Sequence, residues 1–293
     1  MVESRSWGAQ LGSAARYLFL ALLSVTVLIP MVNQLAISFS DRAATAAGFV
    51  AFWPVGFNLF SYHTVISSHA FWSAALISVE RTLLGTGLQM ALTILTAYPL
   101  SRTSQEFKGR TFFIWILLIA LLFNGGLIPL YLVVRSLGLL DTIWALVLPT
   151  ALPLFNVILL VNFFRGVPKE LEEAAYIDGA SHWRILWHVY LPLSLPALAT
   201  LTLFSAVGHW NSWFDGMIYM SDPTHYPLQT YLRTVVIGND LSQFILDPNA
   251  LAFLSDRSIR AAQIFITIIP ILAVYPFLQR YFIAGIKLGA VKG

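Results

Sequence analysis

Six long stretches of the chain are apolar almost all round and carry few charges. They are Tyr17–Phe39, Ala75–Leu100, Thr111–Val134, Thr142–Phe164, Leu191–Asn211 and Ala261–Ile283. Each has close to the ~20 residues that a helix needs to cross the hydrocarbon core of a bilayer. Their helical periodicity is weak, as expected for helices surrounded by lipid and by one another. The pattern predicts an all-α membrane protein with six transmembrane helices.

The composition supports this interpretation. Of the 293 residues, 58% are hydrophobic and only 11% are charged, under half of the ~25% charged residues usual in a soluble domain. The 14% aromatic content also excludes a disordered chain. There is no cysteine, which excludes disulfides, thiolate metal sites and a cysteine nucleophile.

Lysine and arginine set the orientation, because they concentrate in cytoplasmic segments. With both termini in the cytoplasm, the inner segments hold eleven of the 17 Lys and Arg residues and the outer segments hold five, while Arg81 lies in a span. The net charge of +3 therefore reflects membrane topology and gives no reason to invoke nucleic acid. The first stretch, with 23 residues, exceeds the apolar part of a signal peptide, about 7–15 residues, and is expected to remain as a span.

These spans predict a cytoplasmic N-terminus (1–16), one transmembrane domain (17–283) and a cytoplasmic tail (284–293). Two outer segments, 40–74 and 212–260, are long enough to form a docking surface, or else they are solvated connectors. Proline inside a helix removes a hydrogen bond, so kinks are expected at seven positions in the spans: Pro30, Pro99, Pro129, Pro149, Pro153, Pro270 and Pro276.

The inner loop 165–190, between the fourth and fifth stretches, is the most informative part of the chain. Pro168 suits the first position of a helix, and the glutamates that follow favour the positive end of its dipole. Gly179 suits the left-handed position that ends a helix, and Ser181 suits the cap of a second one. The sequence therefore predicts a helical hairpin, with Leu171, Ala174 and Ala175 forming one small apolar face of its first helix.

This loop resembles the EAA loop of ABC importer permeases. The matching positions are Glu173, Ala174, Ala175, Asp178, Gly179, Ala180, Val189, Leu191 and Pro192, with Val189 in place of the usual isoleucine. The resemblance covers most of the chain and points to the carbohydrate-uptake branch, in the subunit equivalent to the smaller maltose permease. Four further segments carry it: "AYPLSR" (97–102), "LIPLYLVVRSLGLLDT" (127–142), "HWNSWF" (209–214) and "QRYFIAGIKLGAVKG" (279–293). "FNGGLIP" (123–129) is most similar to importers of polysaccharide-derived oligosaccharides such as alginate.

The resemblance implies a permease subunit in a bacterial inner membrane that works by alternating access. Its implied partners are a second, related permease, two ABC ATPase subunits, an external solute-binding protein and a sugar or oligosaccharide. The EAA helix would dock in a groove of the ATPase, with Glu173 pairing to a basic or polar group and Ala174 and Ala175 allowing close approach. Gly179 would make the reversal and Asp178 would orient the loop, while Lys287 and Lys292 in the tail would form a second contact.

The chain has no sequence motif for hydrolysing ATP itself, because no G-x-x-x-x-G-K-[ST] string occurs. We therefore expect no catalytic residue, no metal site and no cofactor in this chain, with ATP and Mg²⁺ bound by the partner ATPase. A hairpin without a partner remains the alternative interpretation of the loop.

Sugars are bound by aromatic faces and by amide or carboxylate hydrogen bonds. Candidates for a sugar path in or near the spans are Asn124, Asn156, Asn162, Trp210, Asn211, Trp213 and Glu80. Each also fits a simpler role, since polar side chains join helices in bilayers, and Glu80 and Arg81 fit contacts at the membrane interface or with another subunit.

Two rival functions stay open from the residues alone. A self-sufficient secondary transporter would show an internal repeat and ionisable residues near the midplane. A membrane-embedded glycosyltransferase would cluster acidic residues at one membrane face.

Overall fold

A computed structural model describes residues 7–123, 125–238, 255 and 257–273. Throughout these residues the regular elements are helices, and no strand occurs. The chain divides into two compact units, one drawn from 1–69 and 234–268 and the other from 70–233 and 269–293. The described part therefore confirms the all-α fold class.

The first unit contains α1 (Trp7–Ser38), α2 (Arg42–Ala47) and α3 (Phe60–Ser67), with most of a helix over residues 257–273. Asp41 caps α2 by accepting a 2.7 Å hydrogen bond from the backbone N–H of Ala44. Asn33 donates to the carbonyls of Val50 and Ala51 at 3.1 and 2.7 Å. These bonds hold the segment after α1 against the end of that helix.

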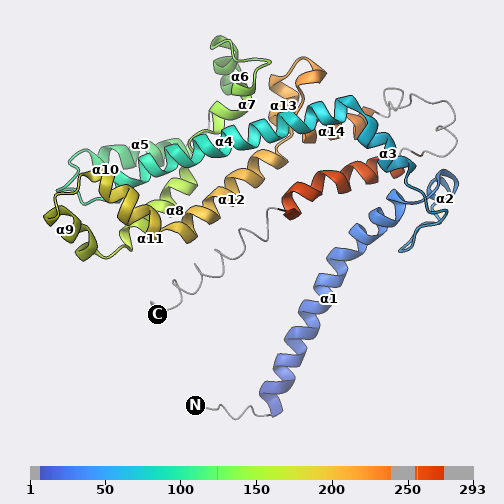
Figure 1. Cartoon of the computed structure of the whole chain (residues 1–293), viewed down its shortest axis with the longest axis horizontal. Coiled ribbons are helices and arrows are strands. Elements are labelled where there is room, and N and C mark those ends of the chain that lie inside the picture. The colour runs from blue at the N-terminus through green and yellow to red at the C-terminus, as the bar shows by residue number, and fades with distance from the viewer. Residues whose placement is uncertain (1–6, 124, 239–254, 256, 274–293) are drawn as a thin grey trace. The chain divides into compact units, whose positions relative to one another are not determined.

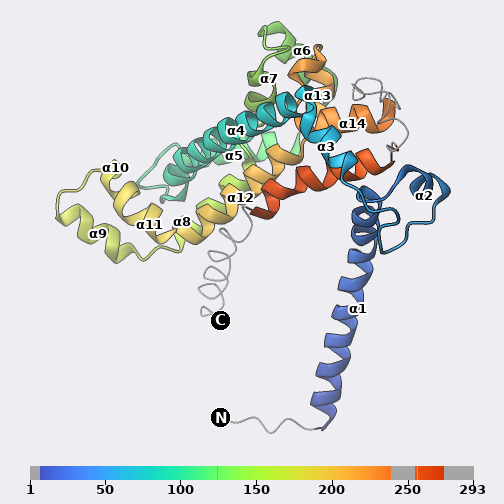
Figure 2. The same cartoon turned by 45° about the vertical axis from the view of Figure 1, so that its right-hand side comes forward.

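The second unit is built on α4, a helix of 33 residues, and contains most of the remaining elements. These are α4 (His69–Ser101), α5 (Arg110–Leu122), α6 (Leu127–Ser136), α7 (Ile143–Val147), α8 (Leu154–Arg165), α9 (Lys169–Ile177), α10 (His182–Ile185), α11 (Leu191–Leu193), α12 (Leu195–Asn211) and α13 (Phe214–Tyr219). A π-helical turn, η2 (Leu186–Tyr190), joins α10 to α11, and α14 (Leu228–Gly238) begins in this unit. Figures 1 and 2 place α9 and α10 beside the C-terminal end of α4 and α13 beside its N-terminal half.

The helix α4 buries one stripe of mostly small and polar side chains: Ala74, Ser78, Arg81, Gly85, Gln89, Thr93 and Ala97. In a bilayer the hydrophobic effect does not drive helices together, so they associate by close packing, which small residues allow. At Gly85 a β-carbon would collide with the imidazole of His209 on α12. The Gln89 side chain donates to the carbonyl of Thr150 at 2.8 Å. The stripe thus packs α4 against other helices of its own unit.

The helices follow the predicted spans only in part. The second predicted span lies within α4, and the first lies within α1 except for Phe39, which follows that helix. The third divides into α5 and α6, and the fourth bends by 48° between Thr150 and Leu154, next to Pro153, which removes a backbone donor. By length and composition, two described helices are able to cross a membrane, or up to five if each bent pair is one span.

The boundaries of the last two predicted spans need correction. The fifth was expected to be continuous from Leu191, but an 82° bend precedes Leu195 and leaves α11 on the side of the loop. The helix expected from Ala261 already covers residues 257–260, and its predicted end at 274–283 lies outside the described residues.

A buried ion pair joins α4 to the first turn of α13. Arg81, only 1% exposed, pairs with Asp215 and also donates to the carbonyl of Ser212 at 3.2 Å. Asp215 accepts further bonds from the Ser212 hydroxyl at 2.8 Å and the Gly216 N–H at 3.0 Å. Arg81 was expected to contact the membrane interface or another subunit, but in the structure it forms an ion pair within the chain.

Breaking this pair on one side is expected to destabilise the chain more than removing both partners. Arg81→Met leaves the Asp215 carboxylate without its counter-charge and costs about 3–5 kcal/mol, whereas Arg81→Met combined with Asp215→Leu costs much less. Both losses of stability are measured by the midpoint temperature of unfolding of each variant in a neutral detergent. Equal losses in the single and double variants would contradict the assignment.

Candidate functional site

The loop between α8 and α12 forms the predicted helical hairpin. Gly179 has φ +75°, the left-handed conformation expected for it. The Gly179 N–H donates to the carbonyl of Tyr176 at 3.0 Å, and the Ala180 N–H donates to that of Ala175 at 2.9 Å. This pair of bonds is the Schellman motif, which satisfies the last carbonyls of a helix.

Two details of the hairpin differ from the prediction. Pro168 is the residue that precedes α9, with extended ψ of 131°, and the helix begins at Lys169. Ser181 occupies the cap position of α10, but its side chain makes no capping bond. Asp178 lies at the C-cap of α9, directly before the reversal.

The helix α9 presents different residues to the bundle and to the outside. Ala175 packs with Ala180 against the main hydrophobic core, which includes Leu160, Phe164 and Ile185. Leu171 is 45% exposed and Ile177 is 87% exposed, while Glu173 and Ala174 are also exposed. The small apolar face expected from Leu171, Ala174 and Ala175 is therefore divided, because Ala175 points inward.

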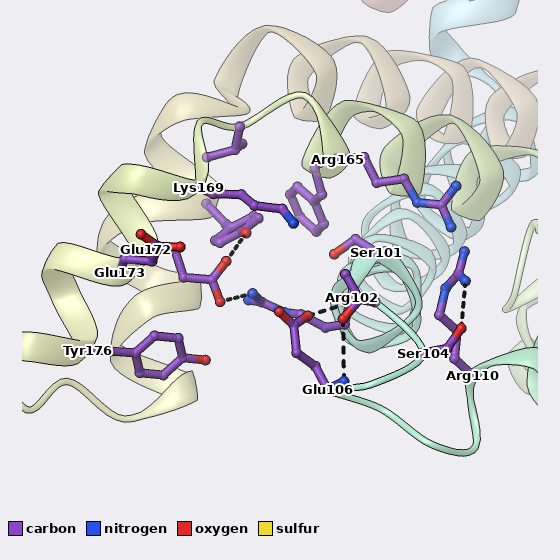
Figure 3. A pocket seen from close by; sticks show the side chains of 14 residues that line it. Ser101, Arg102, Ser104, Glu106, Arg110, Arg165, Lys169, Glu172, Glu173 and Tyr176 are labelled. Carbon is purple, nitrogen blue, oxygen red and sulfur yellow. Dashed lines mark hydrogen bonds and ion pairs between the residues drawn. The ribbon is translucent and has the colours of Figure 1, made fainter.

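The inner side of α9 is anchored by a buried charge network that the sequence did not reveal (Figure 3). Glu172, 8% exposed, pairs with Arg102 at the end of α4 and accepts a 2.6 Å bond from the Tyr190 hydroxyl. The Arg102 guanidinium lies over the rings of Tyr98 and Tyr190, 4.3 and 4.8 Å from their centroids, a favourable cation–π arrangement. Three helical segments thus meet on one arginine.

Burial raises the pKa of the Tyr190 phenol, which keeps it protonated as the donor to Glu172.

A second set of bonds holds the other side of the hairpin. His182 accepts through its carbonyl from the Tyr98 hydroxyl at 3.1 Å, and its ring lies 2.9 Å from the Tyr176 hydroxyl. The hairpin is therefore fixed to α4 at two points.

The sequence hinted at this network only indirectly. Glu172 and Glu173 are adjacent, and the EAA motif drew attention to Glu173 alone. Adjacent residues on a helix face about 100° apart, so the two glutamates are able to lie in different environments. Arg102 was interpreted as an orientation signal and as the last residue of the "AYPLSR" resemblance, and neither links it to a partner 70 residues away.

The candidate sugar-path residues are not gathered in one place among the described residues. Asn156 is buried and donates to Ser205 on α12 at 3.3 Å, the helix-joining role that was the alternative. Trp210 lines an apolar cavity of about 170 Å³, and Glu80 lines a separate cavity of about 190 Å³. The ring of Trp213 lies under the Arg233 guanidinium. Asn162 and Asn211 are exposed. Asn124, Lys287 and Lys292 lie outside the described residues.

Comparisons with known proteins place the loop in a family context. Residues 110–288 match the family described as "Binding-protein-dependent transport system inner membrane component". Protein LplC of Bacillus subtilis is 42% identical over 94% of this chain and 93% of its own length. The polygalacturonan/rhamnogalacturonan transport system permease protein YtcP of the same organism is 38% identical over 94% of this chain and 96% of its own.

The fold is similar to a solved structure as well. A bacterial ABC transporter involved in the import of the acidic polysaccharide alginate contains a chain that superposes with a TM-score of 0.86 at 32% identity, covering 94% of this chain and 98% of that one.

The two glutamates of α9 are expected to respond differently to the same change. Glu172→Gln removes the charge that Arg102 pairs with and lowers the free energy of opening of the hairpin by about 3 kcal/mol. Glu173→Gln, at an exposed position, changes it by less than about 0.5 kcal/mol. Amide hydrogen exchange in α9 measures the opening. A similar response of both variants would show that the buried pair does not anchor the helix.

Proposed function

Because the chain belongs to the family of binding-protein-dependent transport system inner membrane components, we propose that it is the permease subunit of an ABC importer for an oligosaccharide released from a polysaccharide. It works by alternating access in a bacterial inner membrane. The observation that carries this proposal is the α9–α10 hairpin, which is rigid at its base and uncovered on its outward face.

The proposed topology has six spans with both termini in the cytoplasm. The helices α1 and α4, the bent pairs α5–α6 and α7–α8, the helix α12 and the helix that covers residues 257–273 would supply the six. The bends lie beside prolines or short breaks, which membrane helices tolerate where neighbours or a cavity satisfy the backbone. In this topology the hairpin projects into the cytoplasm and α13 lies toward the outside.

The hairpin would act as the coupling element. Two ATPase subunits bind ATP and Mg²⁺, and one of them receives the outward face of α9, formed by Leu171, Ala174 and Ile177. Glu173 pairs with a basic or polar group of the groove. Because Glu172 and the Schellman turn fix the base of the hairpin, a movement of the ATPase is transmitted to α4 and α12. The tail residues Lys287 and Lys292 form a second contact.

The outer end would receive the solute-binding protein, and a second permease completes the pathway. Asp141, with φ +62°, accepts bonds from the backbone of Ser221 at 3.0 Å and Asp222 at 3.3 Å, and its carboxylate lies 3.3 Å from the His225 ring. The Asp222 N–H is the main reason that the pKa of Asp141 is lowered. This network joins the segments before α7 and after α13, giving the outer surface a fixed shape.

The printed names of two similar proteins support a substrate class. YtcP is named for polygalacturonan and rhamnogalacturonan, and the solved transporter for alginate; both sets of names denote acidic polysaccharides. We therefore propose a uronate-containing oligosaccharide. The second permease holds part of it, consistent with the scattered positions of Asn156, Trp210, Trp213 and Glu80 in this subunit.

The assembled importer is expected to hydrolyse ATP faster when the binding protein is loaded. The measurement is ATPase activity of the complex in lipid vesicles with oligogalacturonate, alginate oligomers or neutral arabino-oligosaccharides. Stimulation by a uronate oligomer with accumulation inside the vesicles supports the proposal. Uptake by this chain alone, driven by a proton or sodium gradient, would instead identify a secondary transporter.

Changes at the hairpin are expected to separate ATP hydrolysis from uptake. Glu173→Lys reverses the charge at the proposed contact, and Gly179→Pro removes an N–H donor and cannot adopt φ +75°. Both should insert into the membrane normally and lower sugar uptake per ATP hydrolysed at least tenfold, with Glu173→Gln less affected. If all three variants transport as the parent chain does, the hairpin is not the coupling element.

A further inference from the structure

A cavity of about 530 Å³ lies between the hairpin and the ends of α4 and α8 (Figure 3). Four cationic side chains line it, together with carboxylates at Glu106, Glu172 and Glu173; the cations are Arg102, Arg110, Arg165 and Lys169. They come from the end of α4, the start of α5, the end of α8 and the start of α9. Segments distant in the sequence thus bring positive charge to one concave site.

Two of the carboxylates are already occupied. Glu172 is bound by Arg102 and Tyr190. Glu106 accepts a 2.9 Å bond from the backbone N–H of Thr103, which is the main cause of its lowered pKa. The charges of Arg102 and Lys169 lower the pKa of Glu106 further, so the carboxylates offset part of the positive charge. The four cations still outnumber the three carboxylates of the cavity.

The cations, in contrast, retain donors without acceptors. Arg102 is only 8% exposed, and its Nε and Nη2 atoms are buried with no hydrogen-bond partner in the described part of the chain. Arg110 and Arg165 both donate to the same backbone carbonyl, that of Leu100, at 3.1 and 3.4 Å. Each guanidinium has further N–H groups, since arginine carries five donors. In Figure 3 the Lys169 ammonium points into the cavity.

We propose that this cavity binds a phosphate group. Guanidinium groups match phosphate oxygens in two-point hydrogen bonds, and lysine adds a point charge. The cavity directly follows the ends of α4 and α8, which are predicted spans, at the level where basic pockets between spans hold lipid headgroups. The phosphate comes either from an anionic lipid headgroup or from a free phosphate compound.

The proposed binding has a structural consequence for α9. Lys169 is its first residue, whereas Arg165 belongs to α8 and Arg110 to α5. A phosphate held by all three would fasten the start of the hairpin to the bundle from the side opposite the Schellman turn. The binding does not depend on the proposed transport function; only an effect on ATP coupling does.

The test uses the full chain in neutral detergent, titrated with inorganic phosphate at constant ionic strength, and in nanodiscs of phosphatidylcholine with and without phosphatidylglycerol. The readout is the midpoint temperature of unfolding. Arg165→Gln and Lys169→Gln are expected to raise the half-saturating phosphate concentration about tenfold or to abolish the shift caused by phosphatidylglycerol. Arg184→Gln is the matched control, because Arg184 is exposed in the same loop and does not line the cavity.

A shift with inorganic phosphate identifies a free phosphate site, and a shift only with phosphatidylglycerol identifies a lipid headgroup; both support the proposal if Arg184→Gln behaves as the parent chain. The proposal is overturned if neither probe shifts the midpoint, or if Arg184→Gln loses the shift as fully as Lys169→Gln does. Transport is not required for any of these measurements, so the outcome is separate from that of the proposed function.

Discussion

The arrangement of the second unit depends on one buried arginine. Arg102 directly follows α4, pairs with Glu172 of α9 and lies against the rings of Tyr98 and Tyr190. A buried charge is tolerated only when its counter-charge and hydrogen bonds are in place. The hairpin therefore has one position in which this network is complete, and its outward residues are presented in a fixed direction.

The same principle operates at the other end of α4. Arg81, in the first half of α4, forms a second buried pair with Asp215 of α13. Arg81 lies 21 residues before Arg102 in the chain. Between the two pairs α4 buries small and polar residues, so that other helices approach it closely. A helix fixed by ionic contacts near both ends behaves as a rigid connection between the hairpin and α13. This continuity gives alternating access a physical route through the subunit.

The sequence predicted those features of the fold that depend on residues close together in the chain. Hydrophobic length identified α1 and α4, and the conformational freedom of glycine identified the reversal at Gly179. It did not predict Glu172 with Arg102 or Arg81 with Asp215, because these partners are 70 and 134 residues apart and no local pattern links them. The break before Leu195 was also missed, since an apolar run does not reveal where a helix bends. The sequence did not identify the sugar path for a related reason. A buried amide such as Asn156 suits a hydrogen bond between helices, which it makes to Ser205, as well as one to a sugar.

Ile177, 87% exposed on the last turn of α9, has a consequence for the life of the subunit before assembly. An apolar side chain at a protruding turn is energetically unfavourable in water. If α9 docks on an ATPase subunit as proposed, that contact buries the Ile177 side chain. Copies synthesised in excess of their partners would display this adhesive surface to chaperones and proteases, so the cell would benefit from producing the subunits in matched amounts.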